Sequence, residues 1–221
     1  MVAQADLLLI AFASVLLALA SNRWSGTDRW IAALFFDPAA GAFTLRQNWL
    51  LSVVLHDSLK WLSVVAWCAL LLGWIGLRIG GGRAALRRRA GFVLLASFAA
   101  VLAVNLLRAQ SAHSCPWYLA DFGGSAAFFR LFDPVPGNAG PGRCLPSGHA
   151  ASAFMWLAVL PVLAGRRRVQ ACAGVLLLGG VAGLVQVVRG AHFLSHILLT
   201  AAACALVCGL AALAFRSAPP K

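Results

Sequence analysis

Six long apolar segments dominate this sequence and leave few folds open to it. Each has roughly the 17–25 residues that an α-helix needs to cross a bilayer. Because 62% of the 221 residues are apolar and only 11% are charged, a soluble core of this size cannot hide the apolar surface. We therefore predict an all-α protein, one membrane domain over residues 1–221 that forms a six-transmembrane-helix bundle. The spans lie near 5–22, 58–79, 90–108, 148–165, 170–188 and 193–215.

The first apolar segment has a competing interpretation as a secretory signal, because Ala18-Leu-Ala20 resembles a cleavage site. No Lys or Arg precedes it, however, and Asp6 does. The charged n-region of a signal peptide is therefore missing. We expect the segment to be retained as the first span.

The basic residues predict an orientation. The chain has 18 Lys and Arg against six carboxylates, which gives a net charge of +12. In a soluble protein this excess would suggest nucleic acid, but here the basic clusters fall between spans, as the positive-inside rule requires of cytoplasmic loops. We expect both termini inside, the loops at 109–147 and 189–192 outside, and no nucleic-acid partner. The clusters are Arg83, Arg87–Arg89, Arg166–Arg168, Arg216 and Lys221.

The connection between the first two spans fits this orientation less well, because Arg23, Arg29, Arg46 and Lys60 lie in or beside it. It is also rich in aromatic residues, and residues 49–61 have the apolar spacing of an amphipathic helix lying in the membrane interface. Such a helix either anchors the protein or forms a lateral lip that admits a lipid. His56 and Asp57 lie on it, and we leave them out of the predicted site.

The six cysteines divide into two groups. Cys68, Cys172, Cys204 and Cys208 lie inside spans, where Cys behaves as a small apolar residue. Cys115 and Cys144 bracket the long external loop, in a compartment where disulfides persist. We predict that these two form a disulfide.

Two helix starts carry histidine. Pro146-Ser-Gly-His149 directly precedes one apolar run, and a turn of this kind points backbone N–H groups at an anion such as phosphate. His192 lies at the start of the last apolar run, and His196 follows it on the same helix face. If the two helices pack together, the histidines face one pocket.

At these residues the chain resembles the type 2 phosphatidic acid phosphatase (PAP2) superfamily, whose pattern is K-x6-R-P, then P-S-G-H, then S-R-x5-H-x3-D. The resemblance covers roughly residues 90–215. The middle motif is unaltered. In the first, Arg108 replaces Lys and Cys115 replaces Arg before Pro116. In the third, Gln186 replaces Arg and His196 replaces Asp.

The resemblance implies a phosphatase and a role for each matching residue. His192 would attack phosphorus and form a phosphohistidine, and His196 would orient it. His149 would protonate the leaving group and then activate water. Phosphate oxygens would be held by Ser147, Gly148, Arg108, Gln186 and Arg189, and the scheme needs no metal and no cofactor.

The external loop over 117–142 is rich in Gly and Pro, and its length is typical of lids and substrate-binding loops. Arg130 and Arg143 are the cations near it that could reach a phosphate. We take Arg143 as the stand-in for the cation that the first motif has lost.

The predicted function is hydrolysis of a lipid phosphate or diphosphate at the outer leaflet, in what we expect to be a bacterial inner membrane with the site facing the periplasm. Membrane lipids and the substrate are the expected partners, and the oligomeric state is left open. Undecaprenyl diphosphate, phosphatidic acid, phosphatidylglycerophosphate and lipid A phosphates are the candidate substrates.

Two alternatives stay open. One is a metal or haem protein, in which His192 and His196 act as ligands with His113 or His149. The other is a non-catalytic lipid-binding or transport protein that kept the fold, because the motif positions that lost charge are those an enzyme would use.

Overall fold

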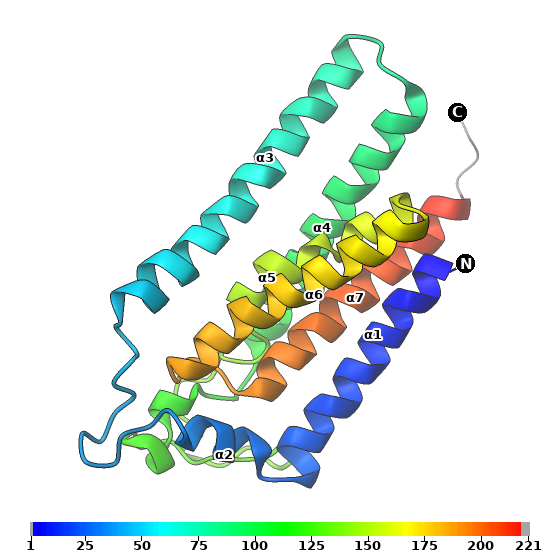
Figure 1. Cartoon of the computed structure of the whole chain (residues 1–221). Coiled ribbons are helices and arrows are strands. Elements are labelled where there is room, and N and C mark those ends of the chain that lie inside the picture. Colours follow the sequence, from blue (N-terminus) through cyan, green and yellow to red (C-terminus); the bar gives the residue numbers. More distant parts are fainter. Residues whose placement is uncertain (1, 218–221) are drawn as a thin grey trace.

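The computed structural model describes residues 2–217, and this part of the chain consists of helices joined by loops, with two isolated β-bridges and no β-strand. Figure 1 shows long helices running side by side, with α2 and the loop after α4 gathered at one end. The α-helices are α1 (Val2–Leu19), α2 (Thr27–Ala33), α3 (Ser58–Ile79), α4 (Ala84–Gln110), α5 (Gly148–Phe154), α6 (Gly165–Val188) and α7 (Leu194–Ser217).

Five helices in residues 2–217 are long and apolar enough to cross a membrane, and they match five of the six predicted spans. Large apolar side chains on their outward faces are exposed, as lipid contact requires. These features are those of an integral membrane protein. The five are Ala3–Trp24, Leu50–Ile79, Ala84–Gln110, Gly165–Val188 and Leu194–Phe215.

The remaining predicted span, 148–165, is shorter than expected and irregular. It is helical over Gly148–Val162 only, and its second half, Met155–Val162, is a 3-10 helix. Pro161 contributes to this, because it lacks the N–H that a regular α-helix would donate to the carbonyl of Leu157. Since a 3-10 helix rises about 2.0 Å per residue rather than about 1.5 Å, the segment still extends about 26 Å, close to the thickness of the hydrocarbon core.

The structure also differs from the expected separate interfacial helix at 49–61. Leu50–Asp57 forms π-helical turns that continue without interruption into α3. No Gly or Pro between Trp49 and Trp61 stops the helix. The aromatic stretch thus extends the second long helix.

Small residues line the centre of the bundle, where α4, α5 and α7 approach one another and α1 packs along α7. Alanine side chains there are buried, and they let helix backbones come close enough for dense packing. Examples are Ala96, Ala100, Ala150, Ala151, Ala201 and Ala205.

The arginine clusters and the histidine-bearing loops lie at opposite ends of the bundle. Arg168 pairs with Asp6 near the start of α1, and a guanidinium nitrogen of Arg88 donates to the carbonyl of Phe215 near the end of α7. We call the other end, which carries α2 and residues 111–147, the loop end (Figure 1). The predicted basic residue Lys221 lies outside the described residues.

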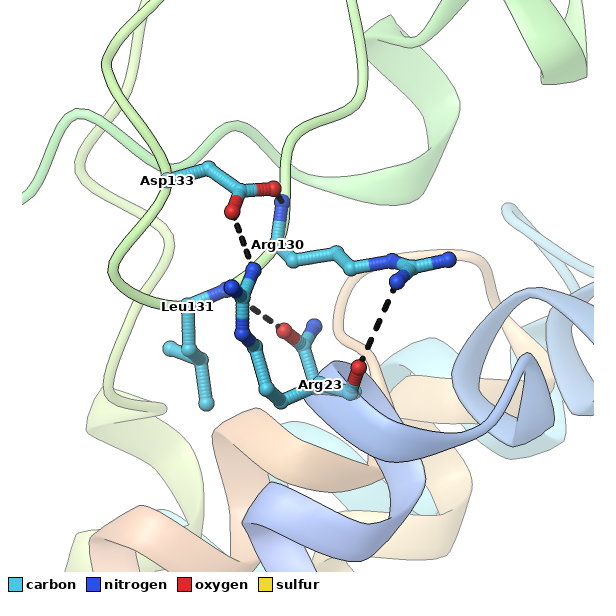
Figure 2. Close-up of polar contacts among 5 residues, drawn as sticks. Arg23, Arg130, Leu131 and Asp133 are labelled. Carbon is cyan, nitrogen blue, oxygen red and sulfur yellow. Dashed lines mark hydrogen bonds and ion pairs between the residues drawn. The ribbon is translucent and has the colours of Figure 1, made fainter.

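The loop after α4 is tied to the N-terminal segment at the loop end. Figure 2 shows Arg23 paired with Asp133, and the guanidinium of Arg130 directed to the carbonyl of Arg23. The N–H of Leu131 donates to Oδ1 of Asn22 at 2.7 Å. Arg130 is therefore used to fasten the loop to the end of the first long helix.

Candidate active site

The Pro-Ser-Gly turn is held in place by the last helix. Ser147 is fully buried and is the N-cap of α5, where its hydroxyl accepts the N–H of Ala150. Its own N–H donates to Oγ1 of Thr200 at 2.8 Å, and Thr200 donates to the carbonyl of His196 at 2.7 Å. Thr200 thus joins the start of α5 to the first turn of α7.

The start of α5 faces Arg108. A Cβ placed on Gly148 would lie 3.1 Å from a guanidinium nitrogen of Arg108, so glycine here lets the cation approach the helix start. Nε of Arg108 donates to the carbonyl of Arg143 at 2.9 Å, which fixes its direction. This end of the helix presents backbone N–H groups and one guanidinium, the combination that suits a phosphate oxygen.

An apolar groove of about 550 Å³ runs from this point along α3, α4 and α5. His149 and Arg108 line it, together with Lys60 and Asn105. Most of the remaining lining is apolar, as suits a hydrocarbon chain with a polar headgroup. The apolar part is formed by Val64, Trp67, Phe98, Val101 and Met155.

His192 and His196 form a buried pair at the start of α7. Their Nδ1 atoms are 3.4 Å apart, and the two residues are 6% and 2% exposed. A ring N–H of His196 also hydrogen-bonds to the backbone carbonyl of Cys144. If that N–H is on Nε2, Nδ1 of His196 accepts and Nδ1 of His192 donates, which places the ring lone pair of neutral His192 on Nε2.

The turn before His192 is fixed by α6. The carbonyl of Gln186 accepts the N–H groups of Ala191 and His192 at 2.8 and 3.3 Å. The amide oxygen of Gln186 accepts a hydrogen bond from Arg189 at 3.3 Å, so the two predicted phosphate ligands are in direct contact.

Arg189 is held by a residue that lies far away in sequence. Its Nε donates to the carbonyl of Arg46 at 3.0 Å, and the guanidinium of Arg46 lies 4.2 Å from the ring centre of Trp117. Burial is the main cause that lowers the pKa of Arg189, with a further contribution from the charge of Arg46, while Asp57 opposes the shift. The guanidinium remains a cation at neutral pH.

Arg143 contributes through its backbone. Its N–H donates to the carbonyl of Ser111 at 2.7 Å, and its carbonyl accepts a hydrogen bond from Nε of Arg108. The residue adopts a left-handed conformation with φ 57°. The side chain is exposed. Binding of phosphate by the Arg143 side chain stays a prediction.

The structure joins Cys115 and Cys144 in a disulfide, with Cα atoms 5.2 Å apart. Cys144 is fully buried, and its sulfur lies 3.3 Å from Nδ1 of His192. The position at which the motif has Arg is thus occupied by half of a cross-link. This cross-link holds the Cys144 carbonyl against His196.

Ligand atoms of Cys144, His192 and His196 lie within 4.8 Å of one another, which bears on the metal alternative. A metal binds cysteine as a thiolate, and the sulfur of Cys144 is committed to the disulfide. Two imidazoles of this group remain, and neither His113 nor His149 belongs to it, so the group has fewer than the three protein ligands of a catalytic zinc site. The residues present therefore fit a metal poorly while the disulfide is intact.

Several residues that build the site were not predicted to belong to a phosphatase site. His113 stacks on Phe129 with ring centres 4.2 Å apart and lies 6.5 Å from the ring of His196. Burial lowers its pKa. Thr200 and Lys60 also reach the site, and Asp28 contacts the start of α7. A helical projection places Thr200 below His196, but no local pattern links Asp28 to a helix that begins 166 residues later.

Fold and site together define a class: a helical membrane protein with a buried histidine pair and a cationic, N–H-rich helix start beside an apolar groove. Comparison with known families is in agreement. The PAP2 superfamily model matches residues 89–219, more than half of the chain, and the protein belongs to this superfamily. No curated protein and no solved structure matches the chain.

Proposed function

We propose that the protein is a membrane phosphatase that hydrolyses a lipid phosphate or diphosphate through a phosphohistidine on His192. The observation that carries this proposal is the buried His192–His196 pair. Thr200 joins the first turn of α7, which holds this pair, to the turn that bears His149. Membership of the PAP2 superfamily, whose members are generally phosphatases, supports the reaction class.

In the first step, Nε2 of His192 attacks phosphorus and the bond to the leaving oxygen breaks. His149 gives its proton to that oxygen, which departs as an alcohol or a phosphate. The negative charge that builds up on the phosphoryl oxygens is stabilised by Arg108, Arg189 and the N–H groups at the start of α5.

In the second step, His149 takes a proton from water while the water oxygen attacks phosphorus. The P–N bond breaks, inorganic phosphate leaves, and His192 is regenerated. His196 holds the His192 ring throughout: with its Nε2–H toward the Cys144 carbonyl, its Nδ1 accepts the Nδ1–H of His192, and the lone pair of His192 lies on Nε2.

A lipid substrate is supported by the groove beside His149. Its apolar walls suit an acyl or prenyl chain, and Lys60 and Arg108 are cations that could meet its phosphate. The same four lipids remain candidates: undecaprenyl diphosphate, phosphatidic acid, phosphatidylglycerophosphate and lipid A phosphates. The arginine clusters at the opposite end of the bundle support an outward-facing site, which we place in a bacterial inner membrane.

Three changes from the family pattern remove charged side chains from the site: Cys115 and Gln186 stand at Arg positions, and His196 stands at the Asp position. His196 orients His192 without a negative charge, and Gln186 supplies a hydrogen bond without a positive one. We therefore expect slower turnover than a site with the full set of charges, because transition-state stabilisation here is largely electrostatic.

The test is phosphate release by the purified protein in detergent with EDTA, across a panel of the four lipid classes. Release that persists in EDTA and falls at least about 10³-fold in His192→Ala is expected. Release that EDTA abolishes would point to a metal site. Absence of release from every lipid would favour the non-catalytic binder.

A second comparison separates the roles of the histidines. With p-nitrophenyl phosphate, whose leaving group needs no proton, His149→Ala is expected to form the phosphohistidine and then hydrolyse it slowly. The phosphorylated protein should accumulate in His149→Ala and be absent from His192→Ala. Accumulation in His192→Ala would contradict the assignment of the nucleophile.

A further inference from the structure

Asp28 is a buried carboxylate that the proposed reaction does not use. It lies in the first turn of α2, outside the segment matched by the family model, and is 2% exposed. Among the side chains that the structure describes, no cation pairs with it, so its charge is balanced by hydrogen-bond donors alone. A carboxylate in such surroundings is costly unless its lone pairs are filled.

Three donors fill them, and two belong to one residue of α7. Oδ1 accepts the N–H of Ser195 at 2.9 Å, and Oδ2 accepts the Ser195 hydroxyl. Nδ2 of Asn22 donates to Oδ2 at 2.9 Å. A helix is usually capped by the residue that directly precedes its first turn. Here Asp28, which belongs to another helix, caps the first turn of α7.

The third donor is itself held in one orientation. Oδ1 of Asn22 accepts the N–H of Leu131, so its Nδ2 must face Asp28. The carboxylate is therefore fastened to the end of the first long helix and to the loop after α4. Its position does not depend on a flexible side chain.

Ser195 lies between the two histidines in sequence. On the other side of the turn, α6 holds His192 through the Gln186 carbonyl. The short segment that carries His192 is therefore fixed at two points, by Gln186 before it and by Asp28 after it. Moving either point alters the 3.4 Å contact between His192 and His196.

We propose that Asp28 is a positioning residue for the histidine pair: by binding Ser195 it sets where α7 begins and how His192 faces the phosphate. This inference rests on the proposed phosphatase function. A misplacement of about 1 Å can lower a rate about 10²-fold, so loss of Asp28 acts on turnover more than on substrate binding.

The test compares Asp28→Asn with Asp121→Asn in the full-length protein in detergent. The control removes an exposed pair with Arg29 at the same end of the molecule. Asp28→Asn is expected to lower kcat about 10- to 100-fold with KM changed less than about twofold. Unchanged kcat in Asp28→Asn would overturn the inference.

The double variant Asn22→Asp with Asp28→Asn separates positioning from general destabilisation. In it, the carboxylate of residue 22 accepts the N–H of Leu131 and an N–H of the side-chain amide of residue 28. The amide oxygen of residue 28 still accepts the Ser195 N–H. Recovery of kcat together with the melting temperature is expected. Recovery of the melting temperature alone would contradict a positioning role.

A spectroscopic arm does not depend on turnover. The ¹⁵N imidazole signals of His192 and His196 are expected to shift in Asp28→Asn, to return in the double variant, and to stay in place in Asp121→Asn. Unmoved signals in Asp28→Asn would overturn the inference. If the wild type releases no phosphate, the phosphatase proposal fails, and these signals alone decide whether Asp28 positions the pair.

Discussion

Gly148 shows how one residue ties backbone geometry to charge. Its hydrogen faces Arg108, where a methyl group would lie 3.1 Å from the guanidinium. Glycine is a poor helix former, yet it stands at the first position of α5. The local cost is explained by the close approach of the cation.

Replacing this glycine should therefore separate activity from stability. Gly148→Ala should displace Arg108 and lower kcat/KM about tenfold, while helix propensity keeps the melting temperature unchanged or slightly higher. The matched control is Gly180→Ala in α6, where a Cβ meets nothing within 4 Å. Equal kcat/KM in both variants would contradict the role given to Arg108.

His113 is one residue at which pH should act on stability. Burial lowers its pKa below the ordinary 6.5. It therefore stays neutral in the native state at pH values where the unfolded chain binds a proton. This contribution to stability is complete above about pH 6.5 and is lost as the pH falls below it.

Melting temperatures between pH 8 and pH 5 in detergent measure this effect. The wild type should lose stability below about pH 6.5. His113→Phe, which keeps a ring to stack on Phe129, should lose less over the same interval. Parallel curves for the two proteins would show that His113 does not carry the pH dependence.

At the scale of elements, the site depends on how α5 and α7 are joined. Thr200, one turn after His196, accepts the N–H of Ser147 at the start of α5 and donates to its own helix. The contact is fully buried. Two helix starts are thereby held in one relative position.

Thr200→Val keeps the shape of this side chain and removes both hydrogen bonds. The buried N–H of Ser147 then lacks an acceptor, which costs about 1–3 kcal/mol. A lower unfolding midpoint and a lower kcat are expected, whereas the exposed control Thr44→Val should change neither. A midpoint equal to that of the control would mean that the contact contributes nothing to the junction.

At the scale of the whole molecule, charge and chemistry are separated along the bundle. Arginine clusters gather at one end, while the histidines, the disulfide and the anchored loop lie at the other. This separation is what an outward-facing site for lipid phosphates requires. It also makes the orientation testable without knowledge of the substrate.

Exposed positions at the two ends serve as reporters of sidedness. Ser125→Cys, at the loop end, should react with a membrane-impermeant maleimide in intact bacterial cells. Ala84→Cys, beside the α3–α4 turn, should react only after the membrane is permeabilised. The reverse pattern would place the site in the cytoplasm and contradict the proposed orientation.

The sequence by itself determined the class of fold and predicted the candidate site residues in the last two thirds of the chain. Apolar runs long enough to span a bilayer can bury their polar backbone only as helices, which is why five of the six predicted spans are confirmed. The motif around Pro146–His149 is local, and a local pattern is readable without the fold. The remaining predicted span, 148–165, is helical over Gly148–Val162 with a 3-10 second half, a geometry that composition does not reveal.

Only the tertiary structure decided how the N-terminal third takes part. Asp28 at the start of α7, Arg46 beside Arg189 and Lys60 in the groove are contacts between residues far apart in sequence. No periodicity encodes such pairs, because they depend on which helix ends meet when the bundle packs. The histidines could be predicted from the sequence, whereas the groups that hold them in place could be identified only in the folded molecule.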